Sequence, residues 1–72
     1  MVVQERVNNM IEVDYVYKSK LTGKWYIASK SFTDRKKALA FMYAMQKRGY
    51  IIDGYRCDDP LDKEWLDYRF KL

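Results

Sequence analysis

In this 72-residue chain, the residues whose type and spacing best indicate a function are the lysines and arginines, which can bind anionic groups. Residues 18–48 carry nine of them against Asp34 alone, a net charge of +8, whereas residues 1–17 and 49–72 each carry a net charge of −2. A block of one sign attracts the opposite sign, so the predicted chemistry is the binding of a polyanion or an acidic protein surface. The candidate basic residues are Lys18, Lys20, Lys24, Lys30, Arg35, Lys36, Lys37, Lys47 and Arg48.

The run Arg35-Lys36-Lys37 is the most suggestive part of this block, because it opens an expected helix. Each exposed cation in a first helical turn opposes the helix dipole by about 0.3–1 kcal/mol. A sequence selected for stability alone would avoid the run, so its placement favours a binding partner. The alternative is a solvated face that answers the acidic C-terminal segment across the fold, and the sequence leaves both open.

Four aromatic residues are further binding candidates: Tyr17, Trp25, Tyr26 and Tyr43. The first three flank the lysines of an expected hairpin, and aromatic rings stack on nucleic-acid bases with about 1–3 kcal/mol per base. Packing of the same rings across strands is the alternative. The sequence has neither a helix-turn-helix pair nor the glycine pattern of an RNA-recognition motif. Tyr43 is expected to be exposed, because it faces away from the apolar stripe of its helix.

Catalytic and metal-binding chemistry has few candidates in a chain with no histidine and one cysteine. Cys57 lies beside Asp58 and Asp59, and carboxylates raise the pKa of a neighbouring thiol and so lower its reactivity. Those two acids, with Asp53 and Asp62, do not have the spacing of a calcium loop, and a zinc site would need more cysteine or histidine ligands. We therefore expect a protein that is not an enzyme and uses no cofactor or metal.

The lone cysteine and residues 1–10 indicate the compartment. One cysteine cannot form an internal disulfide, which argues against a secreted disulfide scaffold. Residues 1–10 contain no apolar run long enough for a signal peptide or a membrane span, and they suit either a short helix or a loosely ordered arm. We expect a cytoplasmic protein without membrane contact.

Hydrophobic alternation predicts two strands joined by a turn. Over Ile11–Lys18, isoleucine, valine and tyrosine alternate with charged residues, which is the period of a half-buried strand. The polar stretch Ser19–Gly23 predicts a hairpin loop, and Lys24–Phe32 is the expected second strand. Neither set of alternating side chains in that second strand is uniformly apolar, so the face that points inward stays open.

A helix is expected next. Ser31 and Asp34 have the spacing of a capping box, with Thr33 as an alternative cap. Gly49 follows two cations, which is typical of a helix C-terminus. The apolar stripe of this helix comprises Ala38, Phe41, Met42 and Met45.

The remaining elements are a third strand over Tyr50–Cys57, with Ile51 and Ile52 as its core, and a closing helix that begins at Asp59-Pro60. The expected apolar residues of the closing helix are Leu61, Trp65 and either Leu66 or Tyr68. The prediction is a single α+β domain over residues 1–72. Its element order is β-β-α-β-α, with an antiparallel hairpin, a third strand and the main helix packed on one face.

Three segments between Tyr17 and Asp59 resemble small uncharacterised proteins of phages and prophages of Gram-positive bacteria. They are Y-K-S-K-L-T-G-K-W, S-F-T-D-R-K-K-A-L-A-F-M-Y-A-M and G-Y-R-C-D-D-P. The resemblance implies an accessory role, such as inhibiting or redirecting a host enzyme, countering a defence system such as a CRISPR nuclease, or binding DNA. It assigns no functional residue.

These observations give one leading hypothesis and two alternatives. The leading hypothesis is a non-enzymatic, phage-type accessory protein that binds a host protein or nucleoprotein through its basic face and nearby aromatic residues, and modulates or inhibits it. The first alternative is direct, low-specificity binding of DNA or RNA by the same surface. The second is a structural homodimer, in which the hairpin edge or the third strand pairs with a second copy.

Overall fold

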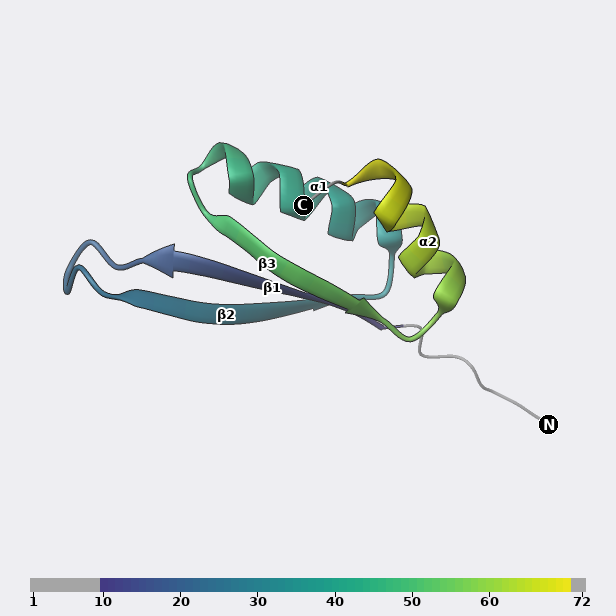
Figure 1. Cartoon of the computed structure of the whole chain (residues 1–72), viewed down its shortest axis with the longest axis horizontal. Helices are drawn as coiled ribbons and strands as arrows, with labels where there is room; N and C mark the ends of the chain where they lie inside the picture. Colours follow the sequence, from purple (N-terminus) through teal and green to yellow (C-terminus); the bar gives the residue numbers. More distant parts are fainter. Residues whose placement is uncertain (1–9, 71–72) are drawn as a thin grey trace.

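The fold is a three-stranded antiparallel sheet with two helices on one side of it (Figure 1). The computed structural model describes residues 10–70, and the segment expected to be a helix or an arm lies, over residues 1–9, outside this range. The elements are β1 (Ile11–Lys18), β2 (Trp25–Phe32), α1 (Arg35–Lys47), β3 (Ile51–Cys57) and α2 (Pro60–Arg69). The α+β class and the order β-β-α-β-α are confirmed.

The hairpin of β1 and β2 forms the longest pairing, in register from Ile11 opposite Phe32 to Lys18 opposite Trp25. β1 is the central strand, because β3 pairs antiparallel with its other side. Gly23 has a φ of +73° in the hairpin turn, a conformation that glycine adopts without steric cost. The turn therefore closes as the sequence predicts, with β2 beginning one residue later than expected.

Helix α1 begins at a different cap from the two favoured by the sequence. Asp34 is the N-cap, and its carboxylate accepts a hydrogen bond of 2.8 Å from the backbone N–H of Lys36. The expectation that Ser31 or Thr33 caps the helix is wrong, because Ser31 still belongs to β2 and Asp34 has the extended backbone of a cap.

The C-terminus of α1 is confirmed. Gly49 has a φ of +91°, and the backbone N–H of Tyr50 donates to the carbonyl of Met45. With the bond from Gly49 to the carbonyl of Gln46, this is a Schellman motif. The motif reverses the chain and carries it directly into β3.

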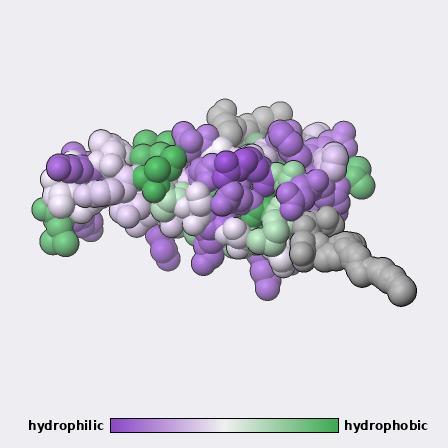
Figure 2. Space-filling view, turned by 90° about the horizontal axis from the view of Figure 1, so that it is seen from below, coloured by the Kyte–Doolittle hydropathy of each residue, from purple (hydrophilic) through white to green (hydrophobic). Residues whose placement is uncertain are grey.

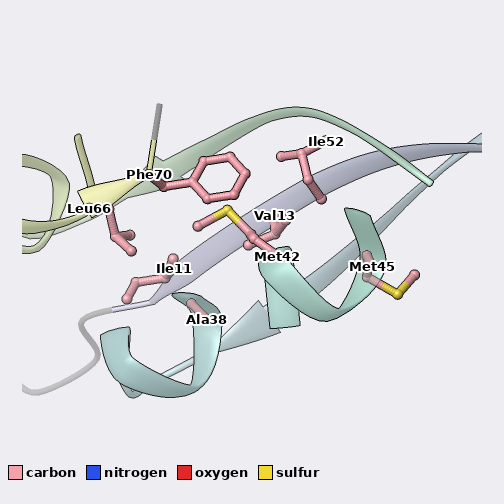
Figure 3. Packing of buried hydrophobic residues seen from close by; sticks show 8 residues of the cluster. All are labelled: Ile11, Val13, Ala38, Met42, Met45, Ile52, Leu66 and Phe70. Carbon is pink, nitrogen blue, oxygen red and sulfur yellow. The ribbon is translucent and has the colours of Figure 1, made fainter. Parts of the chain in front are cut away.

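The core lies between the sheet and both helices (Figure 3). Among residues 10–70, eight are buried: Ile11, Val13, Ala38, Met42, Met45, Ile52, Leu66 and Phe70. Phe41, the fourth expected member of the helix stripe, is half-buried. In β2 the inward set is Ala28, Phe32 and their alternate neighbours, because Phe32 lies opposite buried Ile11. The sequence did not decide which face of β2 points inward, and the structure shows that it is the face of Ala28 and Phe32.

Two expected core residues, Ile51 and Leu61, lie at the surface, and of the two alternatives Leu66 and Tyr68 it is Leu66 that is buried. Ile51 is 54% exposed, whereas its neighbour Ile52 is buried, because successive strand residues point to opposite faces. In α2, Leu61 and Tyr68 are exposed and Leu66 is the buried anchor, with Trp65 half-buried beside it. The two-isoleucine core and the role of Leu61 are therefore corrected.

Candidate functional site

The basic block of the sequence is divided between two ends of the fold. Helix α1 is 13 residues long, so its termini are about 20 Å apart. Its C-terminus lies toward the β1–β2 turn and its N-terminus lies beside α2 (Figure 1). We call residues 17–26 with 47–50 the hairpin end, and residues 33–37 with α2 the α2 end.

A notch of about 440 Å³ opens at the hairpin end. The β1–β3 pairing ends at Val16 opposite Ile51, so β1 continues past the point where β3 begins. One wall comes from the hairpin, over residues 17–21 with Trp25, and the other from residues 48–50 behind the Schellman turn. The notch thus depends on an overhanging hairpin and a tight helix end.

The walls of the notch are basic. Lys18, Lys20 and Arg48 line it, and no acidic residue occurs over residues 15–33 or 35–52. Within residues 10–70, the four salt bridges found involve none of these three cations. Their charge is therefore not neutralised inside the described fold and is open to an anion.

Lys24 and Lys47 extend the basic surface around the notch, because Lys24 directly precedes Trp25 and Lys47 directly precedes Arg48, and both of these line the notch. Both side chains are exposed. Five of the nine predicted basic residues therefore gather at the hairpin end.

The tyrosines of the hairpin end pack on one another. The ring of Tyr17 lies 5.8 Å from that of Tyr26 and 5.8 Å from that of Tyr50, with interplanar angles of 30° and 26°. Trp25 lies on the opposite face of the sheet, one residue out of phase with Tyr26, and is 56% exposed. The structure therefore does not assemble the three hairpin aromatics into one stacking platform.

At the α2 end, the expected conflict between Arg35 and the helix dipole is answered within the fold. Nη1 of Arg35 lies 3.4 Å from Oδ1 of Asp62, and its guanidinium lies 4.9 Å from the centre of the Trp65 ring. Arg69 stacks on the same ring at 4.1 Å. For Arg35 the structure therefore fits the alternative in which the basic face answers the acidic C-terminal segment, because Asp62 of that segment pairs with it.

The other predicted residues lie away from the notch. Lys36 and Lys37 are exposed at the α2 end and take part in no salt bridge found within residues 10–70. Lys30 lies about 6 Å from the rings of Phe32 and Phe41. Tyr43 is 48% exposed, as expected, and its hydroxyl donates to the carbonyl of Arg69 at 2.6 Å.

The cysteine has an environment that disfavours nucleophilic chemistry. Burial and, next, the charge of Asp62 raise the pKa of the Cys57 thiol above its ordinary value. The expected direction is confirmed, although its largest cause is burial and not the adjacent carboxylates.

Three of the four acids considered for a cation have other partners, and Asp62 is paired with Arg35. The fourth, Asp53, is exposed. Asp58 accepts from the backbone N–H of Met10, and Asp59 caps α2 by accepting from Leu61 at 2.8 Å. Over the described range, no group of three or more cysteine or carboxylate side chains is placed to hold a metal ion. In that range, too, neither helix is long and apolar enough to cross a membrane.

One surface was missed by the sequence reasoning, namely an apolar row on the sheet face that the helices leave uncovered. Val16 lies between Ile27 of β2 and Ile51 of β3, and Trp25 follows beside them. Ile27 is 65% exposed. The signal lay in the alternation: these residues occupy the strand positions between those that face the helices.

Comparison with known proteins leaves these surfaces to be interpreted from their own geometry. No family model matches the chain, and neither a curated protein nor a solved structure is significantly similar to it.

Proposed function

We propose that this chain is a non-enzymatic accessory protein, of the phage type suggested by its sequence, that binds an acidic surface of a host protein or nucleoprotein through its hairpin end. The observation that carries the proposal is the notch. Three cations line it together with aromatic residues, and none of the three has an acidic partner within the described fold. Binding would modulate or inhibit the partner by occupying its acidic surface.

The cations of the hairpin end supply attraction and orientation. Exposed charges of one sign steer an oppositely charged partner and raise its association rate, and salt screens the effect. Arg48 can also hold a carboxylate with two parallel hydrogen bonds, which a lysine cannot do. The notch therefore suits an acidic side chain that enters between its two walls.

The tyrosine packing favours a protein partner over stacked bases. The ring of Tyr17 packs against those of Tyr26 and Tyr50, with ring centres 5.8 Å apart in each pair, so part of the aromatic surface that a base would need is used inside the fold. Leu21, 97% exposed on the hairpin wall of the notch, adds an aliphatic contact of the kind that protein surfaces offer.

The proposal is tested by matched charge reversals at the two ends. Lys20→Glu with Arg48→Glu reverses the notch, and Lys36→Glu with Lys37→Glu makes the same change of charge at the α2 end. Each protein is used to capture partners from a nuclease-treated host lysate. We expect the wild type and the α2-end variant to retain the same protein and the notch variant to lose it.

Two results would overturn the proposal. One is equal retention by both variants, since binding would then not require the notch. The other is capture that disappears on nuclease treatment together with a gel shift of purified duplex or single strands at low salt. In that case the surface binds nucleic acid directly, and log Kd would vary linearly with log salt.

A further inference from the structure

The apolar row on the open face of the sheet has no cover within the described residues. Figure 2 views the molecule from below, and it shows a hydrophobic patch set among polar side chains. Along the row, Ile27 is 65% exposed, Ile51 is 54% exposed and Trp25 is 56% exposed, with half-buried Val16 between the two isoleucines. Contiguous apolar patches of this kind typically mark an interaction surface.

Charges of opposite sign flank the row along β1. Lys18 lies two residues beyond Val16 toward the hairpin turn, and Asp14 lies two residues before it. Successive same-face residues are about 6.7 Å apart along a strand, so the two charges are placed symmetrically about Val16. Asp14 accepts a hydrogen bond of 2.6 Å from Ser29 Oγ and shares the guanidinium of Arg56 with Glu12, so two carboxylates face one cation here and a net negative charge remains beside the row.

We propose that the open face binds a second copy of this chain, through a twofold axis that lies in the interface and runs perpendicular to the strands. Such an axis reverses the strand direction of the second copy. Ile27 then meets Ile27, Ile51 meets Ile51, and Lys18 of each copy meets Asp14 of the other. A twofold axis parallel to the strands would instead oppose Lys18 to Lys18, which like-charge repulsion disfavours.

A second copy fits this surface better than a foreign partner, because an isologous interface must be complementary to itself. The row meets that condition, because each isoleucine contacts the same isoleucine of the second copy, and Lys18 of each copy contacts Asp14 of the other. Two sheets packed face to face lie about 10 Å apart with strands nearly aligned, a spacing that isoleucine and tryptophan side chains fill.

The small core supplies an independent reason. Eight residues are buried in the described fold, and domains of this size are commonly stabilised by oligomerisation. Burying the open face of two copies would add a second apolar layer to each. The dimer differs from edge-to-edge pairing of strands, because its contacts are between side chains of the two faces.

This inference does not depend on the proposed binding function. The antiparallel arrangement places the two notches at opposite ends of the dimer, where Lys20 and Arg48 remain free for an acidic partner. Lys18 borders both surfaces, so the substitutions that test the notch leave it unchanged.

The first test is self-association measured by sedimentation from about 1 µM to about 1 mM, the range in which weak interfaces dissociate. We expect the full chain to pass from monomer to dimer and Ile27→Lys to stay monomeric. Leu61→Lys is the matched control, since Leu61 is 67% exposed in α2 and lies outside the open face. A wild type that is monomeric throughout, or an Ile27→Lys protein that still dimerises, overturns the proposal.

The second test fixes the direction of the axis. Lys18→Asp and Asp14→Lys should each weaken self-association by about tenfold or more, because each puts like charges in contact twice. Mixing the two variants should restore dimers, since both contacts then join opposite charges. If the mixture does not associate although both variants are folded, the axis is wrong and the proposal falls.

Asp14→Lys removes the contacts with Ser29 and Arg56, so a readout that avoids this variant is also needed. Added salt should weaken the wild-type dimer and strengthen association of Lys18→Asp, because salt screens attraction in the first and repulsion in the second. A salt response of the same sign in both proteins contradicts the exchange of Lys18 and Asp14.

Discussion

The hairpin end and the α2 end both carry several lysines and arginines, but these cations differ in whether an acid of the fold pairs with them. At the α2 end, Arg35 pairs with Asp62 and stacks on Trp65. At the hairpin end, Lys18, Lys20 and Arg48 surround a notch and form no salt bridge within residues 10–70. Lys36 and Lys37 of the α2 end are also exposed and form no salt bridge found within residues 10–70, but they lie outside the notch. A binding surface is therefore identified by where the fold places acids and notch walls, and not by charge in the sequence alone.

The largest expected effect removes the support of the α2 end. Leu66 is fully buried, so Leu66→Ala should lower the free energy of unfolding by about 2–5 kcal/mol, the cost of a cavity in a core. Leu61→Ala, in the same helix at an exposed position, should change it by less than about 0.5 kcal/mol. Urea unfolding followed by circular dichroism measures both, and similar costs would contradict the position of α2.

The next effect concerns the helix that carries Asp62. Asp59 accepts a hydrogen bond from Leu61 as the N-cap of α2, and Asp59→Ala should cost about 0.5–2 kcal/mol of unfolding free energy. Asp53→Ala is the control, because Asp53 is exposed and forms no side-chain hydrogen bond found in the described part of the chain. Equal unfolding midpoints in urea for the two variants would rule out the cap.

The comparison itself is sharpened by neutralising cations at both ends. Arg35→Gln removes an ion pair and a cation–π contact and should lower the free energy of unfolding by about 1 kcal/mol. Lys20→Gln and Arg48→Gln should lower it by less than about 0.5 kcal/mol, or raise it slightly by relieving like-charge repulsion. Thermal melts of the three variants test this, and a larger loss at the hairpin end would reverse the comparison.

The smallest effect is a pH dependence of the α2 end. The hydrogen bond from the Tyr55 hydroxyl, and next the one from Lys63, hold the pKa of Asp67 below its ordinary value, while burial and that same bond to Asp67 raise the pKa of Tyr55. A carboxylate with a depressed folded pKa stabilises the fold above its unfolded pKa, about 3.9, and this stability is lost as pH falls through the folded value.

The measurement is urea unfolding between about pH 6 and about pH 3, across the ordinary range of carboxyl titration. Asp67→Asn should show a shallower loss of stability in acid than the wild type, because the linked proton uptake is gone. Asp53→Asn is the matched control, and an identical acid slope for wild type and Asp67→Asn would show that the Tyr55–Asp67 contact does not form.

Elements with strong local signals could be predicted from the sequence. The alternation over Ile11–Lys18 gives the bounds of β1, and Asp59-Pro60 and Gly49 mark helix ends through contacts within a few residues. The exposure of Ile51 could not be assigned from a run of two isoleucines, since the register that decides it comes from pairing with β1.

The candidate site was predictable in residue type and not in arrangement. Arg35 and Asp62 are 27 positions apart, and no local pattern links them. Arg35 and Arg48 lie at opposite ends of α1, and the net charge of residues 18–48 gives no sign of this separation. The phase of β2 relative to β1 places Trp25 opposite Lys18 and away from the stacked tyrosines, and that phase depends on the turn and on the core.

The most direct test of free charge at the hairpin end is a backbone NMR titration of the chain with a glutamate-rich peptide. We expect the largest shifts at Lys20, Arg48 and the backbone of Gly49, and small shifts at Arg35, whose charge is paired. Equal shifts at both ends, or the largest shifts at Lys36 and Lys37, would contradict the account.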